Sequence, residues 1–444
     1  MLRRGRLTIY LFGIASIFLF LVTPNSYDYY YNLLLGIVFV CSLLNYFLYK
    51  QKVNYFDFDT LFLISYSIAF FIYPIFLYPI NPQYFVLFNF SFNESTITRA
   101  TALSLLGANF YMMGNVFYQE KVYKVVSCNV LPVRIFVIFL YISFFFFLLF
   151  GGFTFYENLY SGNQVSRADT IFGYFDVLVR VFVLLSVVSQ FYKIHIRQKE
   201  FSLRRINVFL ITFLVLYFLF FLSIGKRGGV ISFFLATLAI YTYYYKPIKL
   251  FAFLKLFLCG VLLMSFVGIY RSNENFTEVA FVDLFMDLIV NNRNTFVAID
   301  YVDNHGITYG ISMLGNIFRI IPMLSGYLHP LLGLSVYETT SSLLITKEAL
   351  GEGSILGLGT SIIADIYLAF GVCGVMIFMG ILGYFIHYLE NKMKYNYIYS
   401  IIIYVTLMSY SVTLVRAEYF YSLNQIVISI FMFVLISNLV SKKV

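Results

Sequence analysis

The sequence predicts an all-helical protein that crosses a membrane many times, and three observations lead to this fold class. Of the 444 residues, 61% are hydrophobic and only 11% are charged, whereas a soluble globular protein carries about 25% charged residues. The 53 Phe and 40 Tyr residues are more than the core of a water-soluble domain of this length could enclose. The apolar residues also form runs of about 20, the length that a helix needs to cross the hydrocarbon layer. Lipid must therefore be the solvent for most of the chain.

Twelve apolar runs predict about twelve transmembrane helices, arranged in a single transmembrane domain of residues 1–444. The runs lie at residues 7–23, 33–49, 59–80, 97–117, 132–150, 174–192, 206–223, 228–245, 250–269, 360–388, 396–414 and 423–440. The first run follows a basic start and resembles a signal peptide, but no small-x-small cleavage site follows it. We therefore expect this run to remain in the protein as its first helix.

The positively charged residues predict how these helices are oriented. Short Lys and Arg clusters occur in alternate connections between the runs, and the positive-inside rule places such connections, and here both termini, in the cytoplasm. Lys dominates that side, whereas Arg dominates the connections that we expect outside. Because Arg presents a planar fork of donors to phosphate or carboxylate, this difference indicates an anionic ligand on the outer side.

Two other classes of partner are not predicted. The net charge of +9 is spread over the connections and is not gathered in a polar domain, so we expect no nucleic acid to bind. The four Cys residues have no CxxC spacing, and neither a disulfide framework nor a zinc site is indicated.

One outer connection, residues 271–359 between predicted helices 9 and 10, is far longer than a linker between helices needs to be. Long loops of this kind are usually functional. Semi-apolar helical stretches at 276–302 and 309–324 alternate in it with Arg, His and acidic residues. We expect this large extracytoplasmic loop to lie on the membrane surface or to dip into it.

The first candidate binding site is the short connection 225–229, with the sequence Gly-Lys-Arg-Gly-Gly between two predicted helices. Lys226 and Arg227 are held at the membrane interface, because the connection is too short to leave it. The glycines allow close backbone approach, and the next helix presents free amide groups and the positive end of its dipole. This combination suits a lipid phosphate. The alternative is a tight turn whose charges meet lipid head groups.

Four further arginines on the predicted outer side are candidate anion ligands: Arg271, Arg293, Arg319 and Arg416. A guanidinium in an apolar setting needs a partner, because burial of a lone charge is costly. The alternative for the three loop arginines is a salt bridge to an acidic residue of the loop, such as Asp283, Asp287 or Asp300. Arg416 and Glu418 are two residues apart, so they point different ways on a helix, and ligand contact and tertiary pairing remain equally open.

The candidate proton acceptors are Glu338, His305, His329 and Asp365. Asp365 lies inside an apolar run, which points to function, but it is close enough to the end of the run to be hydrated. Asp176 and Arg180, four residues apart with Asp first, predict an intrahelical ion pair. The glycines between 351 and 359 run into an apolar span with no preceding strand, so we interpret them as a flexible hinge.

The order of these motifs resembles that of the bacterial O-antigen polymerases, the Wzy-type oligosaccharide repeat-unit polymerases. The resemblance rests on the Gly-Lys-Arg-Gly turn at 225–228, the late loop with scattered arginines, and the outer turn at Arg416. Residues 358–361 (Leu-Gly-Thr-Ser), which lead into 364–371 (Ala-Asp-Ile-Tyr-Leu-Ala-Phe-Gly) and Gly374, are a further match. It covers most of the chain by layout and only short segments by motif.

The resemblance implies a reaction on the outer face of the bacterial inner membrane. A growing glycan on undecaprenyl pyrophosphate would be transferred to the next lipid-linked repeat unit, for O-antigen or a related surface polysaccharide. The fold would be similar to that of the membrane-embedded C-type glycosyltransferases. No cofactor and no metal are expected, and a chain-length regulator protein would be a further partner besides the lipid-linked oligosaccharides and the bilayer.

The chemistry of this reaction assigns roles to the candidate residues. The leaving group is a lipid pyrophosphate, so cations must face the phosphate oxygens as charge builds up. We expect Arg227 and Arg271 in this role, with Lys226, Arg293, Arg319 and Arg416 as further candidates. A base must accept the proton of the attacking sugar hydroxyl, and Glu338 or His329 is expected to do so.

Two alternative functions remain open at this point. An O-antigen ligase, which transfers the finished glycan to the lipid A core, would share the layout. A flippase for lipid-linked oligosaccharides or another transporter would carry ionisable residues near the membrane midplane and broken helices in paired halves. The charges of this sequence gather at the outer edge instead, which favours the polymerase.

Overall fold

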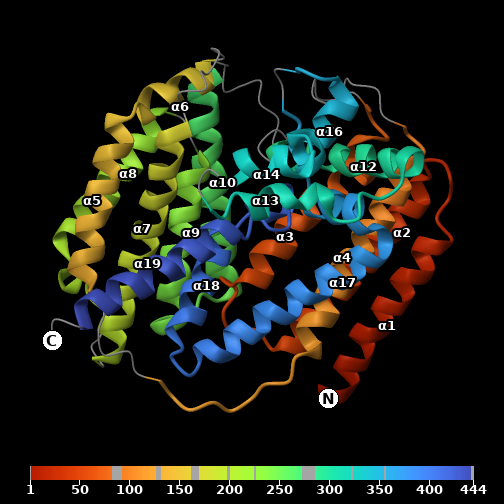
Figure 1. Ribbon diagram of the computed structural model, residues 1–444. Coiled ribbons are helices and arrows are strands. Elements are labelled where there is room, and N and C mark those ends of the chain that lie inside the picture. The colour runs from red at the N-terminus through yellow and green to blue at the C-terminus, as the bar shows by residue number, and fades with distance from the viewer. Residues whose placement is uncertain are drawn as a thin grey trace.

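The computed structural model describes residues 2–82, 93–126, 132–161, 170–197, 201–224, 227–272, 286–321, 324–354 and 357–441. These residues form helices and connections, with no strand among them. Figure 1 shows two groups of long helices, with a layer of short helices across one end. This confirms the predicted all-helical fold class for the described part of the chain.

The first group contains the N-terminal helices and one late helix (Figure 1). Its members are α1 (Leu2–Leu21), α2 (Tyr29–Lys50), α3 (Phe58–Ile72), α4 (Thr96–Phe117) and α17 (Ile362–Met393). The helices α4 and α17 are in backbone contact, because a Cβ atom at Gly114 would collide with the carbonyl of Gly380, and one at Gly383 with the carbonyl of Tyr111. Small residues allow such close approach between helices in a membrane.

The second group surrounds α7 and is packed largely through Phe and Tyr rings (Figure 1). Its members are α5 (Val133–Leu149), α6 (Gly152–Ser161), α7 (Thr170–Ile196), α8 (Val208–Ile224), α9 (Arg227–Tyr244) and α10 (Leu250–Ser272). The ring of Phe144, for example, meets Phe213 and Phe220 edge to face at centroid distances of 5.2 and 5.6 Å. Two final helices, α18 (Ile398–Ser409) and α19 (Leu423–Ser441), pack against α7, and α18 also contacts α17, which joins the groups.

Six short α-helices lie between α10 and α17 in the described residues. They are α11 (Met286–Ile289), α12 (Asn292–His305), α13 (Leu314–Phe318), α14 (Leu324–Leu332), α15 (Val336–Thr339) and α16 (Ser341–Leu350). The helix α12 packs on α4 and α17, and Thr295 Oγ1 is 2.9 Å from Oγ of Ser361, the N-cap of α17. We call the end of the bundle that these helices cover the α12–α16 face; both chain termini lie away from it (Figure 1).

Polar side chains begin several of the long helices. Asp28 and Asp57 accept backbone N–H bonds from Tyr31 and Thr60 at the starts of α2 and α3, at 3.0 and 2.9 Å. Ser361 accepts the N–H of Ala364 at the start of α17 over 3.1 Å. Such N-caps satisfy amide groups that the first turn of a helix leaves without an intrahelical partner.

Every one of the twelve predicted runs coincides with a helix or with most of one. Within the described part of the chain, five helical segments are long and apolar enough to cross a membrane: Tyr29–Lys50, Phe58–Leu77, Ile171–Ile196, Ile362–Met393 and Leu423–Val440. Six shorter apolar helices accompany them. The positions of the helices are thus as predicted, while the count of twelve spans and the membrane placement of residues 271–359 stay predictions.

A kink in α17 departs from the straight helix that the apolar run predicts. Gly371 has φ 63° and ψ −155°, a backbone conformation that breaks the helical hydrogen bonds around it. The carbonyl of Leu368 accepts the N–H of Thr308 over 2.8 Å, and that of Ala369 accepts the N–H of Gly310 over 3.2 Å. The connection after α12 therefore supplies the hydrogen bonds that the kink removes from α17.

Candidate active site

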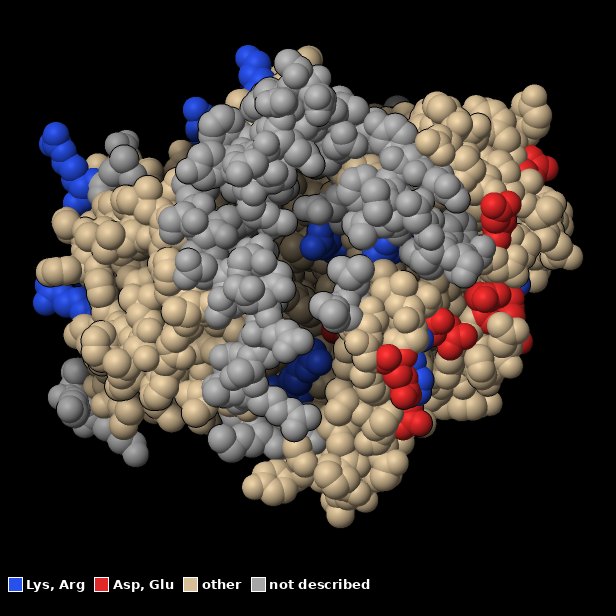
Figure 2. All heavy atoms as spheres, turned by 90° about the horizontal axis from the view of Figure 1, so that it is seen from above, with Lys and Arg blue, Asp and Glu red and all other residues tan. Residues whose placement is uncertain are grey.

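The α12–α16 face is hollowed at its centre and carries charged side chains of both signs. Figure 2 looks down on this end of the bundle and shows Lys or Arg side chains on the floor of the hollow. Acidic side chains gather along one edge of the same view. Charge of one sign thus converges on the hollow, as binding of an anion requires.

The connection between α18 and α19, residues 410–422, carries Arg416 and is fixed on several sides. We call it the Arg416 turn. The Tyr419 N–H donates to Asp365 Oδ2 at the start of α17 over 2.8 Å, and the Tyr419 hydroxyl donates to the carbonyl of Phe378 over 2.9 Å. Oε1 of the buried Glu418 accepts from the Ser342 hydroxyl of α16 over 2.8 Å. Arg416 itself is exposed on this fixed turn.

Asp365 and Glu418 are thereby anchors of the turn. Asp365 is fully buried in the first turn of α17, below the surface that Arg416 reaches. Glu418 accepts a hydrogen bond from Ser342, so this residue makes a tertiary contact, one of the two alternatives that the sequence left open.

Arg319 belongs to the same region, because the start of α19 holds its backbone. The Asn424 side-chain amide donates to the carbonyl of Arg319 over 3.0 Å. The N–H of Arg319, which caps the end of α13, donates to the carbonyl of Gly315 in the same helix. Two predicted arginines, Arg319 and Arg416, are exposed, and the segment of Arg319 is bonded to the first turn of α19, the helix that directly follows the Arg416 turn.

His329 lies close to this pair through its neighbours. Its ring meets that of Phe318, the residue before Arg319, edge to face at 5.5 Å between centroids. Its Nε2 is 2.8 Å from Thr339 Oγ1. The Thr339 hydroxyl hydrogen is directed to backbone carbonyls, those of Ser335 at 3.3 Å and Val336 at 3.2 Å. If the hydroxyl hydrogen points to one of these carbonyls, the hydroxyl accepts from His329 Nε2–H, and the lone pair of the neutral imidazole is then on Nδ1.

Glu338, the other predicted base, caps a helix. Its Oε2 accepts the N–H of Ser335 over 2.8 Å, and Ser335 Oγ accepts the N–H of Glu338 over 3.2 Å. This is a capping box at the start of α15. The bond from the Ser335 N–H favours the carboxylate and holds the pKa of Glu338 below its usual value, which makes it a weaker proton acceptor.

Arg293 lies deeper than Arg319 and Arg416. It is 3% exposed in the first turn of α12, and burial lowers its pKa to about 10. Of its suggested acidic partners, Asp283 and the side chain of Asp287 lie outside the described residues, and Asp300 accepts from the Asn93 side-chain amide over 3.4 Å. His305, at the end of α12, is exposed and stacks on Tyr301.

Comparison with known protein families decides the identity of the chain. The family model for the O-antigen polysaccharide polymerase Wzy matches residues 6–443, nearly the whole sequence. The chain belongs to the Wzy family. Comparisons with curated proteins and with solved structures gave no match. Together with its apolar helices, the family makes the protein an integral inner-membrane enzyme with a glycosyltransferase-type activity that polymerises O-antigen repeat units.

The Gly-Lys-Arg-Gly-Gly connection of this Wzy chain lies partly outside the described residues. Lys226 and the side chain of Arg227 are not described, and the same holds for the Arg271 side chain at the end of α10. The start of α9 is described, and Gly229 lines a small cavity of about 30 Å³ together with Arg180, Tyr410 and Gln425. This connection therefore begins α9 beside the Arg416 turn.

Arg180 makes a further contact in the Wzy fold besides the ion pair that the sequence predicted. The predicted pair with Asp176 is present, at 2.8 Å between Nη2 and Oδ2. Nη1 also donates to the Tyr410 hydroxyl over 3.4 Å, and that hydroxyl donates to Gln425. Arg180 thus holds the first residue of the Arg416 turn, a contact that no local sequence signal indicates.

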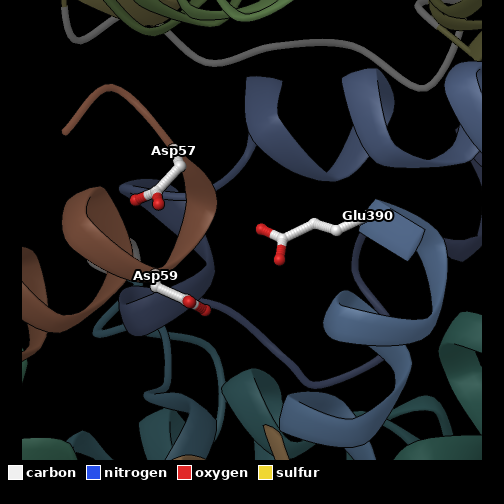
Figure 3. Close-up of side chains that lie close together, drawn as sticks. All are labelled: Asp57, Asp59 and Glu390. Carbon is white, nitrogen blue, oxygen red and sulfur yellow. The ribbon is translucent and has the colours of Figure 1, made fainter. Parts of the chain in front are cut away.

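A second ionic cluster lies at the end of the Wzy fold opposite the α12–α16 face. Figure 3 shows the side chains of Asp57, Asp59 and Glu390 close together, with one carboxylate oxygen of each within 4.8 Å of the others. Lys50 Nζ lies 3.1 Å from Asp59 and 3.4 Å from Glu390, and Lys52 Nζ lies 2.7 Å from Asp57. Two ammonium groups thus occupy the positions that a metal cation would take among these carboxylates.

Proposed function

We propose that this Wzy protein works at the α12–α16 face, turned to the outside of the membrane. There it transfers a growing glycan from undecaprenyl pyrophosphate to the next lipid-linked repeat unit, with both chain termini in the cytoplasm. The Lys residues at the end of α2 and in the last turn of α17 support this orientation, because they lie at the opposite end of the bundle. A chain-length regulator as a further partner rests on the family resemblance alone.

One observation carries the proposed chemistry: the segments of Arg319 and Arg416 are bonded through Asn424, and the Arg416 turn is fixed by Asp365. Negative charge grows on the pyrophosphate oxygen as its bond to the sugar breaks. Guanidinium groups on a preorganised backbone stabilise that charge without reorganisation at the moment of reaction. The remaining cations of the proposed phosphate site are Lys226, Arg227, Arg271 and Arg293.

For the base we select His329, and we assign Glu338 to the cap of α15. In this step the acceptor hydroxyl oxygen attacks the anomeric carbon of the growing glycan, and its proton passes to Nδ1 of His329. The bond between the anomeric carbon and the pyrophosphate oxygen breaks, and the lipid pyrophosphate leaves with the electron pair. The Thr339 hydrogen bond supports this role, because it keeps Nδ1 as the acceptor.

The experiment is a gel of surface glycan from a strain that lacks the gene, beside the same strain carrying the wild-type gene or its Arg416→Ala variant. We expect the deletion and the variant to collapse a ladder to core plus one repeat unit, at wild-type protein level for the variant. Loss of all attached glycan would favour ligation or flipping and overturn the proposal. A full ladder with Arg416→Ala would remove that residue from the site.

A further inference from the structure

A long groove lies between α5 and α8 on the surface of α7, far from the candidate active site. It has a volume of about 1230 Å³, compared with about 300–1,000 Å³ for typical ligand pockets. It is lined by the start of α5, the end of α7 and the start of α8. These helix ends lie on the side of the bundle opposite the α12–α16 face (Figure 1).

The walls and the rim of the groove differ in chemistry. Its walls are apolar and are formed by residues such as Val137, Ile138, Ile142 and Leu216. Its rim carries four cations, which are Arg134, Lys193, Arg197 and Arg205. None of the described lining residues is acidic. Arg134 and Arg197 lie close enough to Lys193 to repel it, so these three cations favour an anion from outside the chain.

The groove is built into the fold, because hydrogen bonds hold its rim. The Gln190 side-chain amide of α7 donates to the carbonyl of Arg205 over 2.9 Å. The Tyr141 hydroxyl of α5 donates to the carbonyl of Phe209 at the start of α8 over 2.9 Å. The segment that enters α8 is therefore tied to both neighbouring helices, which fixes the backbone at this part of the rim.

We propose that this groove binds an anionic phospholipid of the leaflet on that side of the membrane, with the phosphate at the cation cluster and an acyl chain between α5 and α8. A water-soluble anion would leave the apolar walls without a partner. A zwitterionic lipid would place the positive group of its head group beside rim cations that already repel one another. Basic pockets between helices on the cytoplasmic side recognise anionic head groups in this way. The site is independent of the proposed catalytic residues.

The test uses the full-length purified protein and counts retained lipids by native mass spectrometry, after titration with phosphatidylglycerol or with phosphatidylcholine. We expect the wild type to retain phosphatidylglycerol selectively. Arg134→Gln combined with Arg197→Gln should weaken this retention roughly 30-fold, as expected for two cations at an anionic head group. The control is Lys246→Gln with Lys249→Gln, which removes the same charge from exposed positions at the connection of α9 to α10 and should change nothing.

A second variant distinguishes binding of the acyl chain from binding of the phosphate. Thr212 is exposed and lines the groove, so Thr212→Trp fills the apolar part and leaves all four cations in place. Retention of phosphatidylglycerol should fall while the melting temperature stays at the wild-type value. Equal retention of both lipids by the wild type, or unchanged phosphatidylglycerol retention in the Arg134→Gln, Arg197→Gln variant, would overturn the proposal. Retention that survives Thr212→Trp but not the loss of the arginines would show a phosphate contact without an acyl-chain site and would overturn it as well.

Discussion

The carboxylate of Asp365 accepts the backbone N–H of Tyr419 over 2.8 Å, although 54 residues separate the two along the chain. This bond joins the first turn of α17 to the connection between α18 and α19. The Asp365 carboxylate is fully buried, so it could not turn to water if this bond were lost. The position of Arg416, three residues before Tyr419, therefore depends on an acidic residue that lies below the surface.

Replacement of Asp365 should reveal whether hydrogen bonding or charge matters at this position. Asp365→Asn keeps an acceptor oxygen and should retain most of the polymerisation rate. Asp365→Ala leaves the N–H without a partner, which costs about 1–3 kcal/mol, and should reduce both the rate and the melting temperature. The measurement is repeat-unit incorporation by purified protein in liposomes. Equal inactivity of the Asn and Ala variants would show that the negative charge itself is needed.

Substitution of Lys for Arg416 or Arg227 should lower polymerisation strongly although the charge is kept. Lys presents no planar fork, so a bidentate contact with phosphate is lost, and we expect a decrease of roughly 10- to 100-fold, as for loss of one charge-assisted contact in a transition state. Polymer length and yield on a gel, at equal protein level, measure the effect. Arg204→Lys, an exposed residue at the opposite end of the fold, serves as the control and should give a normal ladder.

The contact between His329 and Thr339 makes a prediction about the proposed base. His329→Gln should lower kcat by about 10²–10⁴, the range that a general base contributes. Thr339→Val removes the acceptor that fixes the imidazole and should lower kcat less, whereas Thr339→Ser should behave as wild type. KM should stay nearly constant in all three, because the proposed phosphate contacts are made by other residues. A wild-type kcat in His329→Gln would exclude this residue as the base.

The cluster around Asp59 should contribute to stability and not to chemistry. Asp59 is fully buried and receives hydrogen bonds from Tyr46 and Tyr111 as well as the ion pair with Lys50. Lys50→Met should cost about 3–5 kcal/mol, because it leaves a buried carboxylate with less compensation. Thermal unfolding in detergent measures this, and the added change Asp59→Asn should recover much of the loss. If Lys50→Met unfolds at the wild-type temperature, the cluster does not stabilise the fold.

Two glycines on one face of α17 offer a matched test of the contact with α4. A Cβ at Gly383 would collide with the Tyr111 carbonyl, whereas one at Gly380 would lie 3.7 Å from the Phe110 carbonyl, an ordinary contact. Gly383→Ala should therefore lower the melting temperature. Gly380→Ala should leave it unchanged or raise it, since Ala favours the helix by up to about 1 kcal/mol. The reverse order would contradict the close approach of these helices.

Sequence patterns predicted the helices well, because the length of an apolar run is set by membrane thickness and needs no knowledge of neighbours. They could not predict contacts between distant segments. Lys50 served only as a marker of orientation, yet it is bonded to Glu390, 340 residues away. The spacing of Asp176 and Arg180 predicted their ion pair correctly, but it gave no indication that Arg180 also contacts Tyr410.

The candidate site was predicted in part and for identifiable reasons. The outer arginines were selected from composition and order, and the structure joins the segments of two of them, Arg319 and Arg416. The role of Glu338 could have been read from the sequence, because Ser335 and Glu338 have the spacing of a capping box. The tautomer of His329 could not, since it depends on Thr339 and on where that hydroxyl points.

The broken turn at Gly371 has a consequence for exchanging parts between members of the family. The carbonyls of Leu368 and Ala369 rely on amide groups of Thr308 and Gly310, which belong to another segment. Two carbonyls left bare in an apolar interior would each cost several kcal/mol. A chimera that takes residues 286–350 from a relative keeps these bonds only if the new segment brings backbone amides to the same places, so this segment and α17 should be exchanged together.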